Sequence, residues 1–160
     1  MNLTKTIVFL TALLALPVVA HAADGKELVK QVIGYWAPDG DAMLKMFTEE
    51  KGMGKEDAAA MVAESSKMTF HVEEGTIHVY SKQGVVSMPY EIEKTDVEKK
   101  QITGRTVNPP GAPKAQPVTF TIDGDKIAVQ GGAVPFLLKK IDEAEFKKRR
   151  NAVPSGRTGP

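Results

Sequence analysis

Residues 68–81 read MTFHVEEGTIHVYS and contain the clearest β-hairpin pattern in the chain. Apolar and polar residues alternate on both sides of Glu74-Gly75, which is the period of a β-strand that buries one face. Two connecting residues with glycine second are typical of a tight hairpin turn. Such a turn sets Val72 opposite Ile77, so the apolar residues of both strands share a face. The sequence therefore predicts an antiparallel hairpin with His71 opposite His78 on its outer face.

A second two-residue turn, at Gln83-Gly84, predicts a third strand paired with the second. It sets Val79 opposite Met88 and Ile77 opposite Tyr90. Because Pro89 lacks an N–H, we expect a bulge or a gap in the ladder at that residue. One apolar surface then crosses the three strands, formed by Met68, Phe70, Val72, Ile77, Val79, Val86, Met88, Tyr90 and Ile92.

The rest of the chain continues the meander. We expect strands over 99–106, with Ile102 inward, and on either side of a turn at Gly124-Asp125. A last strand over about 134–140 holds Val134, Phe136 and Leu138. With a first strand at Tyr35-Trp36, this makes eight short antiparallel strands. The predicted fold is mainly β with inserted helices, an up-and-down barrel or half-barrel with a shallow interior.

Four helices accompany the strands. Asp24 is a candidate N-cap for the first, which ends before Gly34. The insertion at about 41–66 holds two more, over 42–50 with Asp41 as N-cap and over 55–66, and we expect them to form a methionine-rich lid. Asp142, with Glu145 three residues later, starts a last helix that runs to about Arg150.

The first 22 residues match a secretory signal, with Lys5 before an apolar run and Ala20-His21-Ala22 at the expected cleavage site. The apolar run is shorter than the about 20 residues that span a bilayer. We therefore expect a periplasmic or secreted protein without a transmembrane segment after cleavage. The folded domain would cover 23–150, and a disordered tail over 151–160 would follow it. The chain has no cysteine, which excludes disulfides and thiol chemistry.

The near-neutral total charge of +1 conceals an uneven distribution. Residues 23–145 contain 20 acidic and 15 basic residues, while Lys147, Lys148, Arg149, Arg150 and Arg157 follow the last acid. An acidic body argues against nucleic acid as a partner. The basic end suits the C-terminus of a helix, or alternatively an anionic surface.

The opening Gly34-Tyr35-Trp36, placed between a short helix and a meander with glycine turns, resembles the G-x-W start of lipocalin-like proteins. More closely, the chain is similar to small exported lipocalin-like domains over about 28–140. In lipocalins an arginine of the last strand packs on the tryptophan, and this chain has Lys139 and Lys140 there. The pieces that carry the closer resemblance are Met68-Thr69-Phe70, Glu74-Gly75, Tyr90 with Ile92, and Ile122-Asp123-Gly124-Asp125.

The resemblance and the apolar inner face together predict a binding protein for a small apolar ligand or an envelope protein partner. A filled barrel that acts through its surface is the alternative within the same class. An internal void well below about 300 Å³ would argue for that alternative. The expected ligand-lining residues are Trp36, Met61, Phe70, Val79, Met88, Tyr90, Phe120 and Phe136.

A third hypothesis concerns His71 and His78. Two histidines opposite each other can share a metal ion with a carboxylate as third ligand. The simpler interpretation is a pair on a solvated sheet face, because two ligands without a fixed third make only a weak site. The motifs of hydrolases, phosphate-binding loops and zinc proteases are missing. We therefore expect no enzymatic activity and no cofactor.

Overall fold

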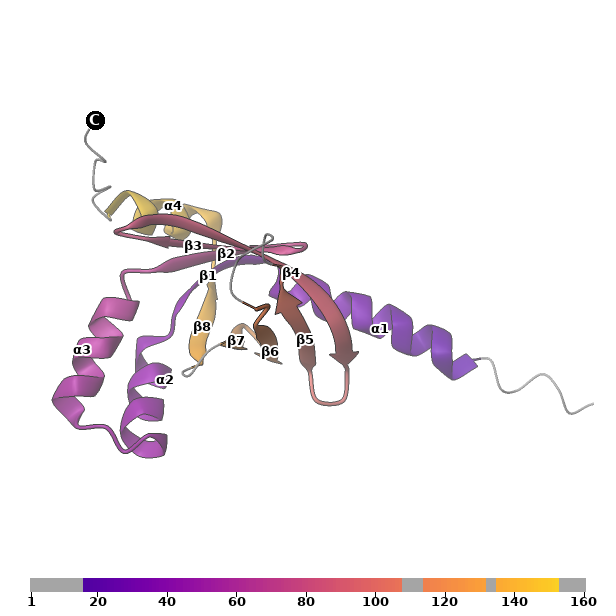
Figure 1. Ribbon diagram of the computed structural model, residues 1–160, viewed down its shortest axis with the longest axis horizontal. Helices are drawn as coiled ribbons and strands as arrows, with labels where there is room; N and C mark the ends of the chain where they lie inside the picture. Colours follow the sequence, from indigo (N-terminus) through magenta and orange to yellow (C-terminus); the bar gives the residue numbers. More distant parts are fainter. Residues whose placement is uncertain (1–15, 108–113, 132–134, 153–160) are drawn as a thin grey trace, which may run out of the picture.

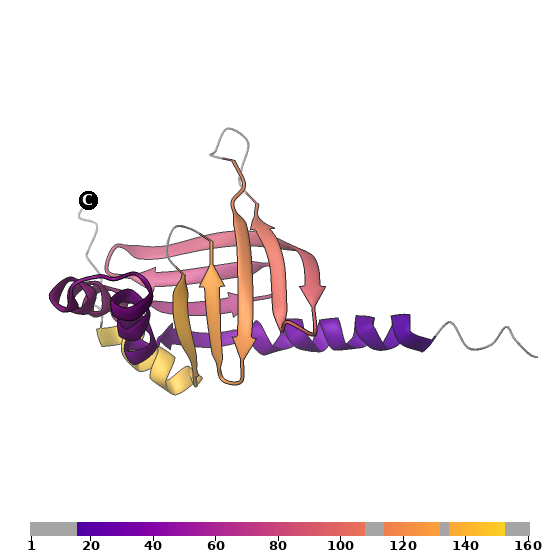
Figure 2. The same cartoon turned by 90° about the horizontal axis from the view of Figure 1, so that it is seen from below.

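The computed structural model describes residues 16–107, 114–131 and 135–152, and its strands form one closed antiparallel barrel. The strands follow chain order around the barrel, and the first pairs with the last, from Tyr35 opposite Ile141 to Pro38 opposite Leu138 (Figures 1 and 2). The predicted eight-stranded barrel is thus confirmed in its closed form. The strands are β1 Gly34–Pro38, β2 Thr69–Glu73, β3 Thr76–Ser81, β4 Gly84–Asp96, β5 Gln101–Thr106, β6 Pro117–Asp123, β7 Lys126–Gln130 and β8 Phe136–Ile141.

The first hairpin has the predicted register. Val72 lies opposite Ile77, and His71 lies opposite His78. The turn of the later hairpin is also at the expected place, because Asp123 pairs with Lys126 across Gly124-Asp125. In both hairpins a two-residue turn and the alternation of apolar residues require the same register.

The register predicted between β3 and β4 is wrong by two residues. The turn residues are Lys82-Gln83, so Ile77 lies opposite Met88, and Val79 lies opposite Val86. Gly84 is the first residue of β4, where its φ of +121° uses the freedom of glycine next to the turn. A shift of two residues leaves each side chain on its original face, and for that reason the apolar pattern did not reveal the error.

The bulge expected at Pro89 lies instead between Ile92 and Lys94, in the pairing with β5. Pro89 is the last residue of β4 that pairs with β3, and the pairing with β5 begins at Tyr90. The carbonyl of Pro89 accepts a hydrogen bond from Val107 N at 2.8 Å. The missing N–H of proline therefore falls where β4 changes neighbours and interrupts no ladder.

The inner faces of the strands form the main core, which α1 (Leu16–Val32) closes at one end with Leu28 and Val32. Two residues expected in this core are exposed, Val86 at 57% and Ile92 at 39%. Both have the inward parity but lie toward opposite ends of the long strand β4. The continuous helix α1 also corrects the N-cap expected at Asp24, which lies inside the helix.

The insertion between β1 and β2 forms a second, smaller core. It comprises α2 (Gly40–Lys45), a π-helical turn η1 (Met46–Glu50) and α3 (Lys55–Ser65), packed side by side (Figure 1). Met43, Met46, Phe47 and Ala58 form its centre, and Leu137 of β8 packs against it. The last helix, α4 (Glu143–Ala152), begins at Asp142 as expected but includes two residues of the predicted tail. The remainder of that tail, like Val134, lies outside the described residues.

Asp39, rather than Asp41, caps α2 and ties the insertion to the barrel. Its carboxylate accepts a hydrogen bond from Ala42 N at 3.3 Å and lies 2.8 Å from Lys126 Nζ of β7. Its own N–H donates to Leu137 O at 2.8 Å. The hydrogen bond from Lys126 holds the pKa of the Asp39 carboxyl below its ordinary value.

Substitution of Asp39 should therefore destabilise the protein in a pH-dependent way. A lowered pKa in the folded state adds stability above the unfolded pKa of about 3.9, and this stability is lost as the pH falls through the folded pKa. Asp39→Asn keeps the cap and removes the charge, so its deficit against wild type should be largest at neutral pH and shrink in acid. Asp39→Ala should cost about 1 kcal/mol more by losing the cap. Urea unfolding at pH 7 and pH 3 measures both, and an equal Asn deficit at the two values would contradict the assignment.

Candidate functional site

The barrel contains a cavity of about 270 Å³ at the end opposite α1. Most of its wall comes from the first halves of β2, β4, β6 and β8 and the second halves of β3, β5 and β7, which meet at one end of an antiparallel barrel. Val72 and Ile77 extend the wall toward the other end. The side chains are apolar except for that of Thr106. The lining residues are Phe70, Val72, Ile77, Val79, Met88, Thr106, Val118, Phe120, Val129, Gly131, Phe136 and Leu138.

Five of the eight residues expected to line a ligand site are in this wall: Phe70, Val79, Met88, Phe120 and Phe136. The inward parity of the strands is the signal that placed them. The same alternation also points Val118, Val129 and Leu138 inward, so it could have added them to the expected lining residues. Thr106 was missed because a threonine in a strand carries no preference for the inner face.

Trp36, expected at the ligand, instead seals the end of the barrel near α1. It is fully buried, and its Nε1 donates a hydrogen bond to Val32 O at 2.9 Å. The ammonium of Lys140 lies 5.3 Å from the centre of the ring and donates to Gln31 O at 3.3 Å. Lys140 thus places a cation over the face of the tryptophan ring. The structural role of Trp36 is to close the core.

Tyr90 is also absent from the cavity wall. Its ring is 5.6 Å from that of Phe120, and its hydroxyl donates to Glu73 O at 3.2 Å. Burial raises the pKa of the Tyr90 phenol above its ordinary value, so the group stays protonated and can donate this bond. Tyr90 therefore anchors the turn between β2 and β3 from inside the barrel.

The helical insertion contributes no residue to the cavity wall among the described parts of the chain. Met61, expected to face a ligand, is 39% exposed on α3. Met43 and Met46 are buried in the core of the insertion itself. Among the described residues, Phe136 alone packs against both cores and also lines the cavity. The helical insertion, which was expected to form a lid over the ligand, instead packs against β8.

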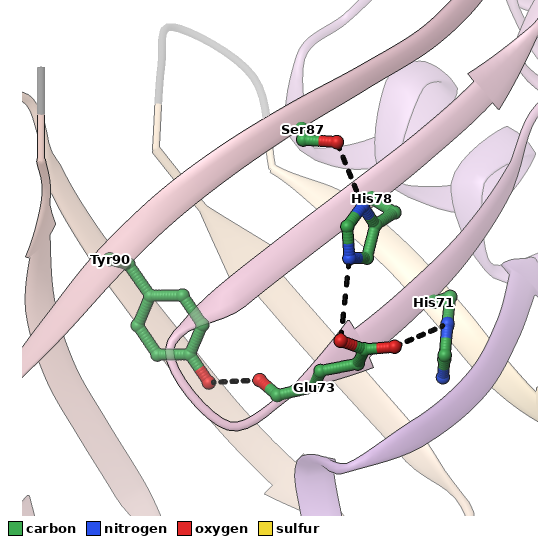
Figure 3. A network of polar contacts seen from close by, with 5 residues as sticks. All are labelled: His71, Glu73, His78, Ser87 and Tyr90. Carbon is green, nitrogen blue, oxygen red and sulfur yellow. Dashed lines mark hydrogen bonds and ion pairs between the residues drawn. The ribbon is translucent and has the colours of Figure 1, made fainter. Parts of the chain in front are cut away.

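On the outer face of the sheet, one carboxylate joins the two predicted histidines (Figure 3). Glu73 Oε1 lies 3.3 Å from His71 Nδ1, and Glu73 Oε2 lies 3.6 Å from His78 Nε2. The other ring nitrogen of His78 is 2.8 Å from Ser87 Oγ. This network extends over three neighbouring strands, β2, β3 and β4.

The histidine face is partly covered, whereas the simpler hypothesis expected a solvated sheet. Phe146 of α4 packs 4.6 Å from the ring of Tyr35, which in turn stacks on His71 at 4.4 Å. The side chains of His71 and His78 are only 20% and 23% exposed. A single large apolar residue in a highly charged helix gave little indication of this contact. The network therefore belongs to the interface between the barrel and α4.

Within the described ranges, no group of three His, Cys, Asp or Glu side chains is placed to hold a metal ion. Each oxygen of Glu73 contacts a different histidine, and the carboxylate of Glu91 on β4 pairs with Arg105 at 3.5 Å. The predicted neighbourhood of His71 and His78 is confirmed, and metal binding by them stays a prediction.

Ser87, His78 and Glu73 follow one another in the order serine, histidine and acid, as in the catalytic triad that activates a serine nucleophile. However, these three side chains lie on the outer face of the sheet, while Val79 and Met88 next to them in sequence face the cavity. A molecule inside the barrel is therefore separated from Ser87 by the sheet itself. The geometry indicates a structural hydrogen-bond network.

Comparison with known proteins found no matching family model, no matching curated protein and no matching solved structure. Within the part of the chain that the structure describes, no helix is both long enough and apolar enough to cross a membrane. Function must therefore be argued from the barrel and its cavity.

Proposed function

We propose that the protein is an exported, lipocalin-like binding protein that holds one small apolar molecule inside its barrel. The cavity of about 270 Å³ with an almost wholly apolar wall is the observation that carries this proposal. Transfer of apolar surface from water into such a wall is favourable. The proposed role is binding without chemistry, since the network of Ser87, His78 and Glu73 among the described residues lies on the other face of the sheet from the cavity.

The volume of the cavity limits the size of the ligand. Usual ligand pockets begin at about 300 Å³, and an apolar cavity of about 150 Å³ is enough to take up benzene. The cavity here, at about 270 Å³, is close to the lower bound of usual pockets. A ligand of about two fused rings fits this volume, and the filled-barrel alternative is correspondingly less favoured.

Binding of an envelope protein is the second candidate. Val85 and Val86 are both 57% exposed at the start of β4. Exposed apolar side chains near a hairpin tip suit contact with a partner, although these two lie on opposite faces of the strand. Native mass spectrometry of the protein purified from its own host separates the two functions, since one gives a small added mass and the other a second polypeptide. The same measurement shows whether the chain begins at Ala23, as export and cleavage require.

Occupation of the cavity by a larger side chain should abolish ligand binding. The probe is 1-aminonaphthalene, an uncharged two-ring fluorophore whose emission changes in apolar surroundings. Val129 lines the cavity, and Val129→Trp should reduce the affinity roughly tenfold or more because the indole fills the space. The matched control is Gln130→Trp, which puts the same ring at the exposed neighbouring position.

Fluorescence titration of wild type and both variants, together with urea unfolding to show that each is folded, gives the result. Saturable binding at one site that is lost only in Val129→Trp supports the interior site. Equal binding by both variants would place the probe elsewhere, and no binding by wild type would remove the proposal.

A further inference from the structure

Among the residues that the structure describes, the cavity wall contains a single side chain that can form an ordinary hydrogen bond. Of the twelve described lining residues, only Thr106 has a hydroxyl, amide or charged group. Thr106 is the last residue of β5 and lies opposite Tyr90, whose side chain is buried in the barrel. Ile102 and Gly104, at the same parity on β5, are also buried, so Thr106 belongs to the inner face.

The hydroxyl of Thr106 is held in place by the backbone next to it. Its Oγ1 accepts a hydrogen bond from Gln116 N at 2.9 Å, while Thr106 N donates to Gln116 O at 2.9 Å. A threonine hydroxyl has one proton to donate besides the lone pairs that it offers. The bond from Gln116 uses a lone pair and leaves the proton, for which the described residues provide no acceptor. A hydroxyl whose oxygen is fixed by this bond, and whose proton is left for donation, thus belongs to a residue at the edge of an apolar cavity.

The residues that line the cavity also favour an uncharged ligand. The described lining residues include no Lys, Arg or His to balance a carboxylate and no acid to balance an amine. Burial of an unpaired charge among apolar side chains is far more costly than burial of a neutral polar group that forms its hydrogen bond. The cavity therefore disfavours ions and tolerates one neutral acceptor.

We infer that the ligand is an uncharged apolar molecule of about two rings that carries one hydrogen-bond acceptor, such as a ketone, and that the Thr106 hydroxyl donates to this acceptor. This inference rests on the proposed binding function. It makes Thr106 a residue that determines ligand specificity, while the apolar wall supplies most of the affinity.

The test compares three compounds of similar shape by their displacement of 1-aminonaphthalene. They are naphthalene, 2-acetylnaphthalene and 2-naphthoate. Wild type should bind the ketone about threefold to tenfold better relative to naphthalene than Thr106→Val does, which is the usual value of one neutral hydrogen bond. The carboxylate should bind at least roughly tenfold more weakly than the ketone at neutral pH.

Two further variants separate the hydroxyl from its structural role. Thr106→Ser keeps the hydroxyl and the bond from Gln116 N, so it should keep the preference for the ketone. Thr103→Val makes the same change at an outward position of β5, opposite Thr119, and should leave all affinities unchanged.

The carbonyl stretch of bound 2-acetylnaphthalene gives a readout that does not depend on any variant. It should be lower in the complex with wild type than in hexane, because a carbonyl that accepts a hydrogen bond is weakened. An unshifted band, or an equal ketone preference in wild type and Thr106→Val, would overturn the role of Thr106 while leaving the binding function intact. Failure of every compound to bind wild type would instead overturn the binding function, and the role of Thr106 with it.

Discussion

Replacement of Trp36 with alanine should lower the free energy of unfolding by about 3–5 kcal/mol, the usual cost of removing a large buried aromatic side chain. Trp36 is fully buried where β1 joins the end of the barrel that α1 closes. The substitution opens a void beneath Val32 and removes the donor to its carbonyl. Since domains of this size are stable by about 5–15 kcal/mol, the variant should be only marginally folded.

Urea unfolding followed by far-UV circular dichroism measures this loss. Trp36→Phe keeps most of the apolar volume and should lose much less. Lys140→Met keeps a long side chain over the ring but removes the ammonium, and should cost only about 0.5–1 kcal/mol, the value of an exposed cation–π contact. A loss below about 1 kcal/mol in Trp36→Ala would show that the tryptophan does not close the core.

Substitution of Gly104 with alanine should destabilise the barrel by about 3 kcal/mol, because the added methyl group would clash with the neighbouring strand. A Cβ at this position would lie 2.2 Å from Glu91 O and 3.1 Å from Glu91 C, both backbone atoms of the neighbouring strand. Backbone atoms cannot rotate away as a side chain does, so β4 and β5 must separate. The bulge between Ile92 and Lys94 lies at the same place and brings the two strands together there.

Gly131→Ala is the matched control, because its Cβ would meet nothing closer than 3.7 Å. That variant should remain within about 0.5 kcal/mol of wild type. The difference between the two alanine variants in urea unfolding is the measured quantity. Equal stabilities would mean that β4 and β5 are not in close contact at Gly104.

The candidate site shows where sequence reasoning succeeds and where it stops. Phe70 and Val79 could be placed on the inner face because a two-residue turn and the alternation of apolar residues agree on one register. The same alternation could not distinguish Met88 from Tyr90 as the partner of Ile77, since both registers bury the same face. The side chains of Trp36 and Tyr90 also point inward. Alternation predicts this direction but not how far along the barrel axis a side chain lies, and it is their position along the axis that keeps them out of the cavity.

The outer face illustrates a second limit. His71 and His78 could be paired from the hairpin alone, because neighbours across a tight turn are fixed by local geometry. The cover over them comes from α4, a helix more than 60 residues further along the chain. Phe146 gives no local sign of its partner, since its helix is otherwise polar and charged.

The amino-acid pattern was enough to predict the strands, their faces and the registers of the two hairpins that turn at Glu74-Gly75 and Gly124-Asp125, because turns and a period of two residues act over a few residues. Only the tertiary structure decided that β1 closes on β8, that Lys140 covers Trp36, and that a cavity of about 270 Å³ remains with Thr106 in its wall. These features arise from contacts between distant parts of the chain. Closure of the barrel and the volume left inside it depend on how all the inward side chains pack together. A pattern of a few neighbouring residues does not contain that information.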